Sequence, residues 1–118
     1  MKRHHSLIPF SQEHHHTLSL CARILRAPEE NYRQEINRHF VDLQRHFADE
    51  EKMFAPLREK LNCENLYQQF INEHRQIIAL YQQADFENAD WNIQLATLLR
   101  RHVRFEEREF FPALETVL

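Results

Sequence analysis

One short phrase occurs twice in the chain, and this repeat limits the folds that the chain can adopt. Residues 46–51 read HFADEE before Phe54 and Pro56, and residues 102–107 read HVRFEE before Phe110 and Pro112, at identical offsets. At ~100° per residue, a His and a Glu four positions apart lie on one helix face about one turn apart, so both reach the same ion. Two such helices predict a two-metal site.

A second repeated pair precedes each phrase. Glu13-His14 is followed by Leu18 and Leu20 at the offsets at which Glu73-His74 is followed by Ile78 and Leu80. The chain therefore reads as two halves, each with a Glu-His helix and then a His-x-x-x-Glu-Glu helix. A pseudo-two-fold bundle around a central dinuclear site requires this arrangement.

The length and composition favour one domain with one site. At 118 residues we expect a single domain over residues 1–118, with a genuine core but no room for a second one. The chain has no glycine, which removes phosphate-cradling loops and dinucleotide fingerprints. A net charge of -3 gives no general attraction to nucleic acid. The nine histidines are the compositional anomaly.

Nothing in the sequence indicates a membrane or a secretory route. No apolar run approaches the ~20 residues that a membrane span needs, and no signal-like apolar stretch follows the basic start. Cys21 and Cys63 lack CxxC spacing, which suits two reduced thiols. We expect a cytoplasmic protein.

Apolar residues at helical spacing predict an all-α, up-down-up-down four-helix bundle, because short connections make consecutive helices antiparallel neighbours. The expected helices cover about 11–26, 28–61 and 64–84, with the last starting near residue 90. Ser11 and Asp90 are the expected N-caps. Pro28, followed by two glutamates, reads as the start of the second helix.

Helical projection shows which ligand-type residues face inward. Glu50 lies ~40° from His46, and Glu106 lies ~40° from His102, each pair inside the apolar stripe of its helix. His74 also lies among apolar residues.

The first helix is harder to assign, because it carries three consecutive histidines. His14 shares its face with Phe10, Leu18, Cys21 and Leu25, whereas His15 is rotated ~100° from it. We choose His14 as the candidate ligand, and its match to His74 in the repeat supports this choice. His15 is kept in reserve.

A plainer interpretation exists for each of these residues. A lone inward histidine is usually a hydrogen-bonded core residue, and Glu-Glu pairs are usually solvated. For Glu51 and Glu107 we therefore favour exposure to solvent or a hydrogen bond to a metal ligand over direct metal binding. His39 is interpreted as packing. However, burying two carboxylates and four imidazoles in one layer without ions costs several kcal/mol per charge, and a metal removes this difficulty.

With these motifs, the chain resembles the hemerythrin-like proteins of the cation-binding HHE type over essentially its full length. The marks are the Glu-His pair, the His-Phe-x-x-Glu-Glu phrase, the helix-3 histidine, and the last His-x-x-x-Glu with its trailing Phe-Phe-Pro. The resemblance implies two non-haem iron ions in a four-helix bundle. The implied terminal ligands are His14, His46, His74 and His102, with Glu50 and Glu106 as bridges. An oxo or hydroxo bridge is expected to complete the charge balance.

The chain departs from the oxygen-carrying hemerythrins at two positions. Those proteins have a further histidine where this chain has Ile78, and an Asp five residues after the last histidine where this chain has Glu106 at four. Fewer ligands leave more open coordination. This argues against simple reversible oxygen carriage and favours reaction with oxygen, peroxide or nitric oxide.

Three functions are therefore carried forward. The leading one is a di-iron module that binds or senses dioxygen, peroxide or nitric oxide. The second is an enzyme in which the same centre removes peroxide or nitric oxide, or donates iron for repair. The third is a metal-stabilised protein-interaction bundle with adventitious zinc, since imidazole and carboxylate suit several divalent ions. Zinc or manganese in place of iron is left open for the same reason.

Overall fold

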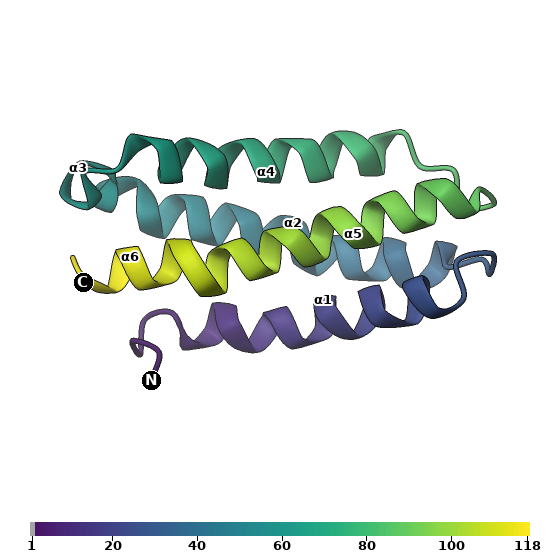
Figure 1. Cartoon of the computed structure of the whole chain (residues 1–118), viewed down its shortest axis with the longest axis horizontal. Helices are drawn as coiled ribbons and strands as arrows, with labels where there is room; N and C mark the ends of the chain where they lie inside the picture. The colour runs from purple at the N-terminus through teal and green to yellow at the C-terminus, as the bar shows by residue number, and fades with distance from the viewer. Residues whose placement is uncertain (1) are drawn as a thin grey trace.

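Four long helices run side by side in a computed structural model of the chain, in which residues 2–118 are described (Figure 1). The elements are α1 (Ile8–Arg26), α2 (Arg33–Phe54), η1 (Ala55–Leu57), α3 (Arg58–Leu61), α4 (Glu64–Gln82), α5 (Ala89–Phe105), η2 (Glu106–Phe110) and α6 (Phe111–Glu115). The bundle measures 44 × 26 × 20 Å, and residues 2–118 contain no strand. The prediction of an all-α four-helix bundle is confirmed.

The start of the second long helix was predicted wrongly. Pro28 does not begin a helix, because α2 starts at Arg33. The buried Tyr32 hydroxyl donates a hydrogen bond to the Ala27 carbonyl at 2.8 Å, and the Asn92 amide donates to the Pro28 carbonyl at 2.8 Å. Side chains of Tyr32 and Asn92 thus satisfy the loop carbonyls in place of helical hydrogen bonds, which overrides the local helix-start pattern.

Both predicted N-caps are also wrong. Ser11 lies inside α1, which begins at Ile8 with Pro9 in its first turn, where the missing N–H costs nothing. Asn88 caps α5, since its side-chain oxygen accepts from the backbone N–H groups of Asp90 and Trp91 at 2.8 and 3.3 Å. Asp90 instead lies in the first turn of α5, near the positive end of the helix dipole.

The helices of this glycine-free chain end by other means. After α2, the single turn η1 takes up Pro56 and leads into α3. Asn62 then ends α3 in the left-handed conformation, with φ 51°. Asparagine tolerates this region better than most residues, so it replaces the usual glycine.

The last long helix changes its winding in the middle. α5 passes at Glu106 into η2, a five-residue π-helical turn, before α6 resumes with Pro112 in its first turn. Proline cannot donate to the carbonyl four residues earlier, and its ring collides with that carbonyl, so a wider turn before Pro112 relieves the conflict. Such π turns often lie at functional sites.

Two apolar clusters fill the bundle, one toward each end. The first is centred on residues such as Ile36, Phe40 and Leu95, and the second on a group of phenylalanines that includes Phe54 and Phe110. The bundle interior also contains a layer of buried histidines and glutamates. Within residues 2–118, no helix has the length and apolar character needed to cross a membrane.

Candidate metal centre

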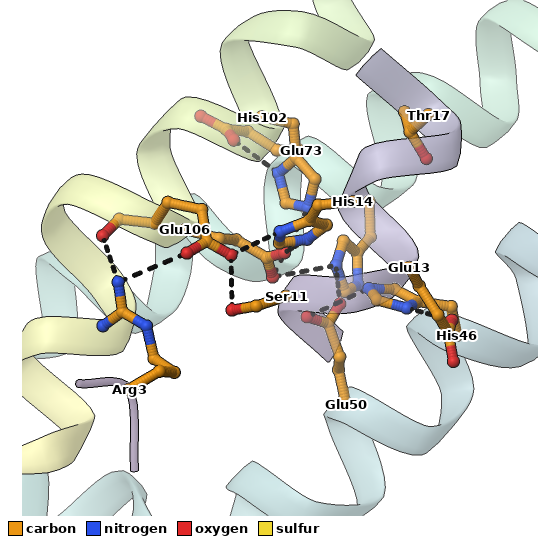
Figure 2. A network of polar contacts seen from close by, with 12 residues as sticks. Arg3, Ser11, Glu13, His14, Thr17, His46, Glu50, Glu73, His102 and Glu106 are labelled. Carbon is orange, nitrogen blue, oxygen red and sulfur yellow. Dashed lines mark hydrogen bonds and ion pairs between the residues drawn. The ribbon is translucent and has the colours of Figure 1, made fainter. Parts of the chain in front are cut away.

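Each of the four long helices contributes one buried histidine to this polar layer, and Figure 2 labels His14, His46 and His102. They are His14 on α1, His46 on α2, His74 on α4 and His102 on α5, none more than 5% exposed. The choice of His14 over His15 agrees with this arrangement, since His15 is exposed on the outer face of α1.

Two glutamates lie between the histidines and are completely buried. One oxygen of Glu50 is 3.3 Å from His46 Nε2, and its other oxygen is 3.2 Å from His74 Nε2. One oxygen of Glu106 is 2.8 Å from His14 Nε2, and its other oxygen is 3.6 Å from His102 Nε2. Each carboxylate therefore directs one oxygen to each side of the centre.

The six residues form two overlapping groups that share the glutamates. In each group, one ligand atom from every residue lies within 4.8 Å of the others. One group is His14, His46, Glu50 and Glu106, and the other is His74, His102, Glu50 and Glu106. Each group thus offers two imidazoles and two shared carboxylates, a donor set that suits a divalent transition metal.

Behind each histidine stands another glutamate, which accepts a hydrogen bond from the Nδ1–H group. The four pairs are His14–Glu107 at 2.6 Å, His46–Glu13 at 2.5 Å, His74–Glu51 at 2.8 Å and His102–Glu73 at 2.6 Å. A carboxylate in this position fixes the tautomer and directs the Nε2 lone pair inward.

These outer glutamates form a closed ring around the bundle. The partner of each histidine comes from a different helix: the η2 extension of α5 serves α1, α1 serves α2, α2 serves α4, and α4 serves α5. Every outer glutamate also neighbours one of the six central residues in sequence. This role was expected for Glu51 and Glu107 but missed for Glu13 and Glu73, although the repeated Glu-His pair was the available signal.

Five of the polar atoms at the centre lack a hydrogen-bond partner within the part of the protein that the structure describes. Buried atoms without a hydrogen bond include both carboxylate oxygens of Glu50, one oxygen of Glu106, and the Nε2 atoms of His74 and His102. Orphaned buried polar groups are rare, and each costs about 1–3 kcal/mol or more. Because these atoms point toward one another, a cation between them would satisfy all of them.

Burial and the neighbouring charges set the protonation of the two central glutamates in the absence of a cation. Burial, followed by the Glu106 carboxylate, raises the pKa of Glu50 well above its usual value. Burial also raises the pKa of Glu106, but His102 and His14 more than offset this, so its pKa falls below the usual range. A bound cation would remove the repulsion between the two carboxylates.

The two matching histidines of the repeat respond oppositely to their surroundings. Burial lowers the pKa of His14, but hydrogen bonds to Glu106 and Glu107 more than offset it and raise the pKa to about 9. Burial and the nearby His102 lower the pKa of His74 to about 3. The first group of ligands therefore carries a proton near neutral pH that a metal must displace.

Aromatic rings hold the histidine planes in place. Phe47 stacks on His74 with ring centroids 3.8 Å apart, and it meets His102 edge-on at 5.6 Å. Phe111 stacks on His14 at 5.7 Å. These contacts restrict rotation of the rings and exclude water from around the polar layer.

The fold and the site define a four-helix-bundle protein whose buried histidines and carboxylates are arranged to bind cations. The family model described as the hemerythrin HHE cation-binding domain matches residues 9–114, nearly the whole chain. The chain belongs to this family. Comparisons with curated proteins and with solved structures gave no match.

Proposed function

We propose that this chain is a non-haem di-iron protein that binds or senses dioxygen or a related small ligand, peroxide or nitric oxide, at a carboxylate-bridged centre. His14 and His46 would hold one ion, His74 and His102 the other. Glu50 and Glu106 would bridge them. When bound, ferrous ions supply a redox-active Lewis-acid pair for a small oxidising ligand.

The main support is the set of buried, unpartnered atoms at the centre of the bundle. Both oxygens of Glu50, one oxygen of Glu106 and the Nε2 atoms of His74 and His102 have no hydrogen-bond partner and converge within ligand distance of one another. Water could satisfy some of them, but the paired His₂Glu₂ groups with a carboxylate behind every histidine are typical of metal ligation. Membership of a cation-binding family supports the same conclusion.

The donor count supports a reactive centre in preference to a structural one. Each group offers two imidazoles and the two shared carboxylates. Ile78 occupies the position of the further histidine of oxygen-carrying hemerythrins, and its side chain packs against the apolar cluster. Positions therefore stay open on the ions for a small ligand.

The decisive experiment is metal analysis of untagged protein after anaerobic reconstitution with ferrous iron. We expect about two irons per chain and, after exposure to air, charge-transfer absorption in the visible spectrum. One zinc per chain, or no metal, would reject the proposal. Addition of peroxide or nitric oxide then separates the two candidate functions: stoichiometric binding supports a sensor, whereas repeated turnover that is lost in Glu50→Ala supports an enzyme.

A further inference from the structure

A groove on the outside of the bundle, between α1 and α2, leads to the candidate centre. It begins as a cavity of about 250 Å³ whose lining includes Glu13, His16, Thr17, His39, Asp42 and His46. A second cavity of about 350 Å³ shares three of these residues, so the groove continues along the helices.

The inner end of the groove is formed by one of the proposed ligands and its partner. His46 lines the cavity, although it is only 3% exposed. Its Nδ1–H donates to Glu13, whose side chain is half exposed (Figure 2). Glu13 therefore connects the solvent with the buried centre.

A polar pair stands between this inner end and the surface. Thr17 lies one turn beyond His14 on α1 and is buried at 3% exposure, and its hydroxyl is 2.9 Å from His39 Nε2. Apolar residues such as Leu20 and Leu43 surround this level of the bundle. A threonine bound to a histidine adds nothing to an apolar core, but it provides oxygen and nitrogen ligands beside the cavity.

The outer part of the groove carries the same types of ligand. His16 and Asp42 line both cavities together with His39. Three arginines also line the groove, Arg45 in the first cavity and Arg23 and Arg38 in the second. Arg45 pairs with Asp42 at 3.1 Å, and Arg23 pairs with Glu35 at 3.3 Å. Burial lowers the pKa of His39, so its ring is neutral near pH 7, and when its Nε2–H donates to Thr17 the Nδ1 lone pair is free for a cation. The Asp42–Arg45 pair is exposed to solvent and therefore weak, so the Asp42 carboxylate and the imidazoles stay available as ligands for a divalent cation.

These ligands are spaced too widely to trap an ion. In the part of the chain that the structure describes, ligand atoms converge only in the two groups of the central site. Weak, successive contacts are the property of a path, because an ion must be able to leave each position.

We propose that the α1–α2 groove is the route by which divalent cations reach the centre, moving past His16, Asp42 and His39 to His46. This inference rests on the proposed metal site, and it assigns a role to histidines that the site itself does not use. Each step exchanges water ligands for single protein ligands, with no redox change.

The test compares metal uptake by two variants of the full chain. One carries His16→Gln, His39→Gln and Asp42→Asn together, and the amide introduced by His39→Gln keeps a hydrogen-bonding group for Thr17. The control is His15→Gln, which alters an exposed histidine that precedes His16 in sequence and is not among the residues that line the two cavities. Chelator-treated protein is mixed with Co²⁺ in a stopped-flow instrument, and the visible absorption reports loading. Release into excess chelator gives the reverse rate.

We expect the triple variant to load and release Co²⁺ about tenfold more slowly than the control, because ligands along a route replace part of the water shell that an ion loses as it passes. The dissociation constant and the final stoichiometry should stay unchanged, because a route changes both rates equally. If the substituted residues instead bound the metal at the centre or positioned its ligands, the dissociation constant for Co²⁺ would change. Asp42→Asn alone, at the exposed end of the groove, should slow Co²⁺ loading and release by a smaller factor. This single variant replaces the triple variant in the test if the triple variant folds poorly.

Equal loading rates in the triple variant and the control would overturn the route. A slower reaction of the loaded variant with oxygen, with unchanged Co²⁺ loading, would also overturn it and would make the groove an oxidant path. If wild-type protein takes up no Co²⁺ or ferrous iron, the proposed function fails instead, so the two failures are distinguishable.

Discussion

The two halves of the bundle contain the same sequence motif, but the backbone after the motif differs between them. Pro56 and Pro112 lie at the same distance after His46 and His102. In the first half the helix runs straight past Glu50 and tightens into the 3₁₀ turn η1. In the second half it widens into the π turn η2 at Glu106 itself. Equal spacing in sequence therefore does not give equal backbone geometry around the centre.

The outer glutamates differ in the same way. Glu107, in the π turn, is held by Ser11 at 2.7 Å and Arg3 at 3.2 Å, as well as by His14. Glu51 binds His74 but keeps a side chain that is 44% exposed. The firmly held glutamate is the one whose histidine has a pKa of about 9. Neighbouring groups, more than residue type, therefore decide which ligand is protonated.

The largest effect should come from removing a bridging carboxylate, and this tests whether the halves share one centre. Glu50→Ala and Glu106→Ala should each lower the metal content from about two ions per chain to one or none, because each glutamate belongs to both ligand groups. Metal analysis after anaerobic reconstitution measures this. Glu59→Ala, an exposed change on α3, is the control. Loss of metal from only one of the two variants would contradict a shared centre.

The next prediction sharpens the contrast between His14 and His74 in chelator-treated protein. Because the pKa of His14 is raised from 6.5 to about 9, the stability that it contributes is fully present below pH 6.5 and is lost as the pH rises through 9. The change in the free energy of unfolding is at most about 3 kcal/mol. Glu107→Gln should reduce this loss, and urea unfolding at pH 6.5 and pH 9 measures it.

His74 should behave in the opposite sense. Its pKa is lowered to about 3, so its contribution to stability is lost as the pH falls below 6.5. Glu107→Gln should leave the loss between pH 6.5 and pH 4.5 unchanged, since Glu107 contacts His14 and not His74 and its own lowered pKa places its titration below this range. Identical pH profiles of wild type and variant on the alkaline side would refute the assigned role of Glu107.

A smaller effect on metal binding is expected from changing the outer glutamates Glu13 and Glu73. Glu13→Gln and Glu73→Gln should each weaken metal binding about 10- to 100-fold, because they orient the imidazoles of His46 and His102 without binding metal. Competition with a chelator of known affinity measures the dissociation constants. If one variant has no effect, the ring does not act equally on both halves.

The smallest effect concerns a helix start in the second half. Asn88→Ala removes the side-chain cap of α5 and should lower the free energy of unfolding by about 1 kcal/mol. Asp90→Ala, at the residue first expected to be the cap, should cost only a few tenths of a kcal/mol through the helix dipole. Urea denaturation of the two variants compares them directly, and a larger loss in Asp90→Ala would contradict the observed cap.

Helical periodicity explains why much of the architecture was predictable. His46 and Glu50 lie four residues apart on one helix, so their shared face follows from the helix alone. The wrong helix start at Pro28 arose because Asn92, 64 residues away, binds its carbonyl. The missed cap at Asn88 depended on one side-chain rotamer. No pattern in the residues near Glu106 distinguishes a π turn from an ordinary helix.

Local residue spacing dictates the number of long helices, the pseudo-two-fold repeat and the six inward-facing His and Glu side chains, so all three were predictable before the chain was folded. Tertiary structure alone decided which glutamate stands behind which histidine. Those hydrogen bonds join residues 23 to 93 positions apart, and each depends on how two helices are rotated against each other. The opposite pKa shifts of His14 and His74 have the same origin, since burial and neighbouring charge exist only after the helices have packed.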